Sequence, residues 1–114
     1  MAKFILPIRE EDKRFLEAIK RGEKTIETRA ATPKYRKIKP GDILVFRCGK
    51  EKLEKKVKEV LVFKSIEELT ETLGIQQIMP FASSVGEMRE IYFSFPGYQG
   101  KIAKYGLIAF LLMC

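Results

Sequence analysis

The stretch PGDILVFRCGKEKLEKKVKEVLVF, residues 40–63, decides the fold. Pro40, Gly41 and Asp42 are typical of a tight turn, and the apolar run ILVF that follows is typical of a buried strand. A second turn, CGKEK, leads into KLEKKVKEVLVF. The stretch therefore predicts two strands that follow one another through a short connection.

The second half of this stretch fits two periodicities. Leu53, Val57, Val60 and Leu61 have the spacing of a helix face, whereas Leu53, Val57, Leu61 and Phe63 share one face of a strand. The β-branched and aromatic residues of VLVF at its end favour a strand. We therefore expect one long strand here.

Working outward, the same criteria assign the remaining segments. We expect strands or extended segments at 4–8, 25–30 and 105–112, helices at 9–24, 65–74 and 84–92, and loops at 33–39 and 95–104. Ser65 with Glu68, and Ser84 with Glu87, have the spacing of a capping box at a helix start. Asp42 is expected to bond the nearby backbone in its turn.

Strands with helices inserted among them indicate an α+β domain. The connections between the second, third and fourth strands are short, which favours an antiparallel sheet that curls into a small barrel. A chain of 114 residues without a low-complexity linker predicts a single domain, 1–114.

Composition restricts the chemistry that is open to this chain. It has no histidine, which excludes histidine general bases and removes the commonest transition-metal ligand. Cys48 and Cys114 match no zinc signature and are expected to be free thiols in an intracellular, cytoplasmic protein. No metal and no cofactor is expected. No membrane partner is expected either, since no apolar run approaches the roughly 18 residues that span a bilayer. The formal charge of +7 favours polyanionic partners, although it also fits a surface that is charged for solubility.

The stretch GEKTIETR, residues 22–29, is unusually polar for a strand. If Ile26 and Thr28 face the core, Glu27 and Arg29 share the opposite face, about 7 Å apart at Cα. Two interpretations stay open. Glu27 and Arg29 form a surface ion pair, or, together with Lys24, they face a ligand to which Arg offers a planar fork and Lys a compact charge.

The chain resembles an ASCH domain of the PUA-like superfamily, particularly its stand-alone archaeal and bacterial members. The resemblance rests on four segments in order, which together cover nearly the whole chain: GEKTIETR (22–29), IKPGDILVF (38–46), VLVFKSIEEL (60–69) and KYGLIAFLL (104–112). It implies a PUA-like curled β-barrel with flanking helices, and a binding cleft beside the first helix and the GEKTIETR strand.

The resemblance also implies a function, namely the binding of RNA or of a nucleotide-like small molecule. The candidate ligand-binding residues are Lys24, Thr25, Glu27, Arg29, Tyr98, Lys104 and Tyr105. The two tyrosines are possible stacking platforms, for which core packing is the alternative. Lys104 would extend a basic rim.

Two alternatives to RNA binding remain. One branch similar to this chain consists of amidohydrolases that act on N4-acetylcytidine with a Lys, Thr and Glu set; Lys24 matches the lysine, but Glu27 and Gln77 stand at the other two positions. A small hydrolase, on a modified nucleoside or on RNA, would here use Lys24 and Glu27 as its reactive pair. The second alternative is an interaction domain for an acidic protein.

Overall fold

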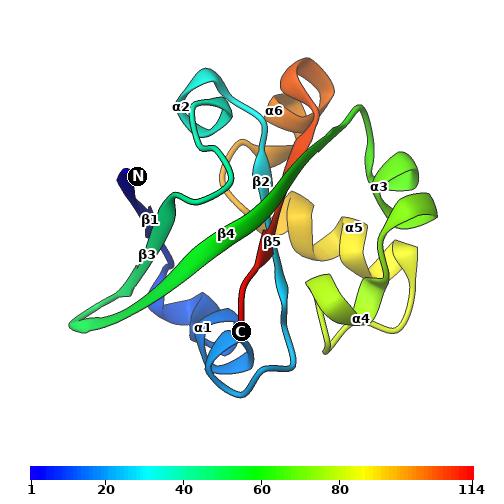
Figure 1. The fold of residues 1–114 in the computed structure, drawn as a ribbon. Coiled ribbons are helices and arrows are strands. Elements are labelled where there is room, and N and C mark those ends of the chain that lie inside the picture. The colour runs from blue at the N-terminus through cyan, green and yellow to red at the C-terminus, as the bar shows by residue number, and fades with distance from the viewer.

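A computed structural model describes all residues, 1–114, and its core is one five-stranded sheet (Figure 1). Five strands form the sheet, in the order β1-β3-β4-β5-β2. Their bounds are β1 Lys3–Pro7, β2 Ile26–Ala30, β3 Ile43–Cys48, β4 Glu51–Phe63 and β5 Leu107–Leu112. The helices are the short 3₁₀ helix η1 Glu10–Asp12 and the α-helices α1 Lys13–Lys20, α2 Pro33–Arg36, α3 Ile66–Thr72, α4 Ile75–Ile78, α5 Val85–Ser94 and α6 Tyr98–Tyr105.

The long strand β4 organises the sheet. Its first half pairs antiparallel with β3, and its second half pairs antiparallel with β5 from Val57 onward, with an irregularity between Val57 and Glu59. Thirteen residues in one strand are enough to serve both neighbours. The long strand and the short connection to β3 that the sequence predicts are both confirmed.

The α+β class is also confirmed, but the arrangement of the sheet differs from the expected antiparallel barrel. β1 runs parallel to β3, and β2 pairs with β5 rather than with β3. The sheet is mixed and is not closed by backbone pairing, because β1 and β2 are its two outer strands. A parallel neighbour requires a crossover connection, and α1, β2 and α2 together supply it between β1 and β3.

Local signals predict the starts of α3 and α5 correctly. The hydroxyl of Ser65 accepts a hydrogen bond from the backbone N–H of Glu68, and Ser84 does the same for Glu87. Asp42 accepts from the backbone N–H groups of Ala2 and Lys39, so it holds its turn as expected. Both cysteines are free thiols.

Three segments differ from the sequence expectation. The predicted loop at 95–104 contains α6, and the predicted loop at 33–39 contains the short helix α2. The first helix begins at Lys13, after a 3₁₀ turn, and not at Arg9. In α6, burial of Ile102 offsets the poor helix propensity of Gly100, a tertiary contribution that no local pattern reveals.

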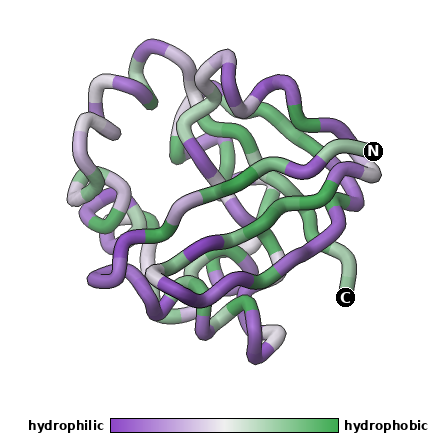
Figure 2. The backbone as a smooth tube through the Cα atoms, turned by 90° about the vertical axis from the view of Figure 1, so that its left-hand side faces the viewer, coloured by the Kyte–Doolittle hydropathy of each residue, from purple (hydrophilic) through white to green (hydrophobic).

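The core has two parts, and hydrophobic segments run mainly through the middle of the molecule (Figure 2). One part lies between the sheet and helices α3 to α6, around Leu69, Met88 and Tyr92. The other lies under β1 and β3, around Leu6, Leu16 and Phe46. None of the helices has the length and apolarity that crossing a bilayer requires.

Candidate functional site

Strand β2 carries the candidate site, and both of its faces are buried. Ile26 and Thr28, the two side chains expected to face the core, are both buried. Glu27, expected on an outer face, is only 5 % exposed, and Lys24 just before the strand is 2 % exposed. Lys24 and Glu27 are therefore inside the molecule and Arg29 is half-buried, whereas Glu23 and Thr25 of the same stretch are exposed. The interpretation of Glu27 and Arg29 as an ordinary surface ion pair is wrong.

The carboxylate of Glu27 is fully occupied by donors from its own chain. Oε1 accepts from the backbone N–H of Thr28 at 3.1 Å and lies 3.3 Å from Lys24 Nζ. Oε2 accepts from Nε and Nη2 of Arg29 at 3.0 and 2.9 Å. A carboxylate has about four acceptor positions, so none is left for a ligand.

Lys24 is equally occupied. Its ammonium group donates to the carbonyl oxygens of Ile26 and Ile78, each at 2.6 Å, and its third N–H faces Glu27. Because Ile78 ends α4, Lys24 ties that helix to β2. Lys24 therefore acts as a clamp within the fold and fixes the position of Glu27.

Arg29 is the member of the trio with capacity to spare. Besides its two bonds to Glu27, Nη1 donates to the carbonyl oxygen of Pro7 at 3.1 Å and lies 3.5 Å from the hydroxyl of Tyr35. A guanidinium has five N–H groups, so one on Nη2 has no partner within the protein. Since Pro7 belongs to β1, this side chain bridges the two outer strands that the backbone does not pair.

The trio carries a net charge of +1 inside the protein. Burial opposes the ionisation of Glu27, but the charges and hydrogen bonds of Lys24 and Arg29 outweigh it and hold the pKa of Glu27 below its ordinary value. Burial lowers the pKa of Lys24, while Glu27 counteracts it. For Arg29, the raising effect of Glu27 on the pKa exceeds the lowering effect of burial. The stability that ionised Glu27 contributes is therefore present at neutral pH and is lost only as the pH falls through its depressed pKa.

The trio lines a cavity of about 170 Å³. Four aromatic side chains contribute to its wall: Phe15, Tyr92, Phe95 and Tyr98. The other lining residues come from β2 and the turn before it, from β1, η1 and the segment between them, from the residue after α4 and from the connection between α5 and α6. They are Pro7, Ile8, Arg9, Asp12, Lys24, Glu27, Thr28, Arg29, Met79 and Pro96. The cavity thus combines an aromatic wall with a positively charged polar wall.

Hydroxyl groups add further polarity. The hydroxyls of Thr28 and Tyr92 share a short hydrogen bond, and the hydroxyl of Tyr98 accepts from the backbone N–H of Ala30. In the Thr28–Tyr92 pair one hydroxyl donates to the other, so the second retains its own hydrogen. Burial raises the pKa of both tyrosines, which therefore stay neutral donors.

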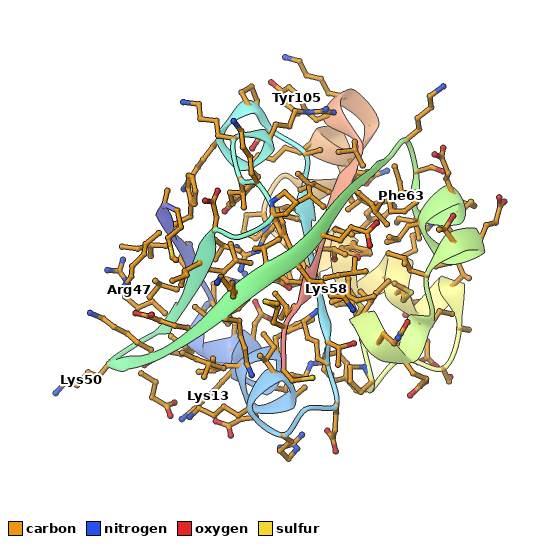
Figure 3. All side chains as sticks on the ribbon, viewed as in Figure 1. Lys13, Arg47, Lys50, Lys58, Phe63 and Tyr105 are labelled. Carbon is orange, nitrogen blue, oxygen red and sulfur yellow. The ribbon has the colours of Figure 1, made fainter.

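The structure brings together four of the seven residues proposed from sequence. Lys24, Glu27, Arg29 and Tyr98 all line the cavity, whereas Thr25, Lys104 and Tyr105 do not. Thr25 bonds through its backbone to Gln77 and Leu112, and Lys104 is exposed with its ammonium 5.1 Å from the ring centre of Tyr105. Tyr105 packs on the second core, at the end of α6 beside α2 (Figure 3).

Sequence reasoning missed much of the wall. Phe15 and Tyr92 have the spacing of apolar helix faces, which predicts only core residues, and both do contribute to the core. Arg9 and Asp12 lie at the start of the helix predicted at 9–24, and nothing in the local sequence indicates that the turn η1 faces β2. No three His, Cys, Asp or Glu side chains come close enough anywhere to hold a metal ion.

Comparisons with known proteins agree with this architecture. The crystal structure of hypothetical protein PH0355 superposes with a TM-score of 0.83 at 37 % identity, covering 98 % of this chain and 97 % of that one. The solution structure of protein PF0455 from Pyrococcus furiosus gives 0.74 at 35 % identity, with 96 % and 94 % covered. No curated protein matches the sequence.

A family model adds the decisive comparison. The ASCH domain model matches residues 12–111, which include β2, helices α1 to α6 and all but the last residue of β5. The mixed sheet with its helices is consistent with the PUA-like fold that the resemblance implied. The chain belongs to the ASCH domain family.

Proposed function

We propose that this protein binds single-stranded RNA and that the cavity beside β2 holds one of its nucleotides. The observation that carries the proposal is the buried trio Lys24, Glu27 and Arg29, which places an uncompensated positive charge in a cavity wall. Burying three ionic groups is expensive, and replacing such groups by apolar ones is often stabilising. A ligand that needs the charge accounts for the arrangement better than stability does.

The shape and lining of the cavity support a nucleotide as the occupant. Its volume of about 170 Å³ is below the roughly 300–1,000 Å³ of sites for drug-sized molecules, so it suits a single ring system. Phe95 and Tyr98, whose ring centres are 5.3 Å apart, offer aromatic surface for base stacking. The unpartnered N–H of Arg29 suits a phosphate or a base carbonyl.

The hydrolase alternative, with Lys24 and Glu27 as the reactive pair, has less support. All N–H groups of Lys24 and all acceptor positions of Glu27 are used within the protein, and the lowered pKa of Glu27 makes it a poor general base. Gln77, which stands where the related amidohydrolases have their glutamate, is exposed and does not line the cavity. The lowered pKa of Lys24 is the one feature in favour of catalysis. Chromatography after incubation with N4-acetylcytidine or RNA is expected to show no product.

The binding proposal predicts a specific loss in the Arg29→Gln variant. We expect its affinity for a short single-stranded RNA at low salt to fall by about 10- to 100-fold, because a charged hydrogen bond of about 1.5–3 kcal/mol is removed. Arg29→Lys keeps the charge without the planar fork, so its affinity should lie between those of the wild type and Arg29→Gln. Fluorescence anisotropy at several salt concentrations measures these affinities.

Two further variants make the result interpretable. Arg89→Gln removes a partly exposed arginine that pairs with Glu67 and does not line the cavity, so it should bind RNA like the wild type. Tyr98→Ala removes aromatic surface without touching the ion pairs and should weaken binding by about 10-fold. RNA binding that is absent in the wild type at low salt, or unchanged in both cavity variants, contradicts the proposal.

A further inference from the structure

The outward face of β1, β3 and β4 is strongly basic. The pairing registers place its side chains in three rows that cross the strands: Pro7, Arg47 and Lys52; Ile5, Val45 and Glu54; and Lys3, Ile43 and Lys56. The inner side chains of the same strands, such as Leu6, Leu44 and Phe46, are buried. We call these nine outward residues the basic face.

Charges on the basic face are mostly uncompensated. Glu54 is the only acidic residue of the basic face, and its carboxylate lies 3.3 Å from the ammonium of Lys3, whose side chain is 61 % exposed. Arg47, Lys52 and Lys56 are exposed and form no ion pair, so the face has a net charge of +3. Arg47 projects from β3, and the additional cations Lys50 and Lys58 lie in the adjoining turn and in β4 (Figure 3).

The apolar part of the face is also exposed. Ile5 is 49 % exposed, and Val45 and Ile43 beside it in the neighbouring strand are half-buried. β1 is an outer strand, so no further strand extends the face at this edge. All nine residues of the basic face are exposed or half-buried. Cations around a shallow apolar strip complement a flexible polyanion that also carries hydrophobic rings.

The first row connects the basic face to the cavity. Pro7 lines the cavity, and its carbonyl oxygen accepts a hydrogen bond from Arg29. Arg47 is opposite Pro7 in the neighbouring strand β3, and Lys52 is opposite Arg47 in β4. Adjacent strands lie about 4.8 Å apart, so Lys52 is about 10 Å from Pro7 across the sheet. Arg9, another cavity residue, follows two positions after Pro7. The cations thus begin at the cavity and continue across the sheet.

We infer that the basic face is the track along which the RNA backbone continues after one nucleotide enters the cavity. This inference rests on the proposed function and extends it from a one-nucleotide pocket to an extended single-stranded site. The phosphates would contact Arg47, Lys52 and Lys56. Bases would lie over Ile5 and Val45.

The test compares two RNA lengths and two triple variants. The track variant is Arg47→Gln with Lys52→Gln and Lys56→Gln, and the control is Lys34→Gln with Lys37→Gln and Lys64→Gln, three exposed lysines without ion pairs that lie off the basic face. All six are surface positions, where substitutions usually leave stability within about 0.5 kcal/mol. Each protein is titrated with a trinucleotide and with a 12-nucleotide single-stranded RNA, at 50 to 200 mM salt.

In the wild type we expect the 12-nucleotide RNA to bind at least about 10-fold tighter than the trinucleotide. The track variant should lose that gain and keep its trinucleotide affinity. The slope of log affinity against log salt should fall by about 2, since each single-strand phosphate contact contributes about 0.7. The control variant should keep both the gain and the slope.

Other outcomes separate the two proposals. A track variant that binds the 12-nucleotide RNA like the wild type, with the same slope, overturns the track while RNA binding in the cavity stands. A wild type that binds neither RNA overturns both. If vesicles containing phosphatidylserine bind through these three residues while RNA does not respond to them, the face belongs to a membrane contact and the RNA assignment is wrong.

Discussion

Replacing Glu27 by Gln is expected to lower the free energy of unfolding by about 3–5 kcal/mol. The substitution keeps the size of the side chain but leaves Lys24 and Arg29 as buried cations without a counter-charge. Removing one partner of a buried ion pair costs far more than the pair contributes, because the remaining charge stays desolvated. Urea denaturation at neutral pH measures the loss.

A matched control is available at the surface. Glu54→Gln breaks the ion pair with Lys3, in which the side chains of Lys3 and Glu54 are 61 % and 52 % exposed. It should lower the free energy of unfolding by less than about 1 kcal/mol. Similar losses in both variants would show that the trio is not buried in the way described. The double variant Lys24→Met with Glu27→Gln should recover part of the loss, because it removes one of the two orphaned cations.

The second large effect is expected for Gly106→Ala, which should cost about 2–6 kcal/mol. Gly106 joins α6 to β5 with φ 80° and ψ −162°, a region of backbone space that is essentially restricted to glycine. A Cβ there would lie 2.2 Å from the carbonyl oxygen of Phe63, which is backbone and cannot swing away. The strain and the overlap add, and thermal or urea unfolding reports the sum.

Gly100→Ala serves as the opposite control. Gly100 lies within α6, is exposed, and has no heavy atom within 4 Å of an added Cβ. Alanine there should stabilise the protein by about 0.5–1 kcal/mol through better helix propensity. A Gly106→Ala variant as stable as the wild type would contradict the close approach of α6 and β4 at this point.

Features with a local cause could be predicted from the sequence. The turn at Pro40–Asp42 and the serine caps at Ser65 and Ser84 depend on neighbours within a few residues. The adjacency of Glu27 and Arg29 follows from strand periodicity, and these two side chains do meet. Short-range geometry is enough for each of these features.

Other features depend on contacts between distant segments. The pairing of β2 with β5 and of β1 with β3 joins residues far apart in sequence, and no turn signal specifies it. The burial of Lys24 and Glu27 results from helices that close over β2. Residues whose charges are typical of a protein surface therefore lie in the interior. Tyr105 differs from its expected place for the same reason. From the sequence it is a candidate for the binding site, but it packs on the second core and does not line the cavity.

Backbone amide chemical shifts measured during titration with a trinucleotide RNA test the central claim most directly. If the cavity beside β2 holds a nucleotide, the largest shift changes should fall on Thr28, Arg29 and Tyr98, and Arg29→Gln should need about 10- to 100-fold more RNA to produce them. Shift changes that are absent at saturating RNA, or confined to residues remote from β2 such as those of α3, would contradict the account.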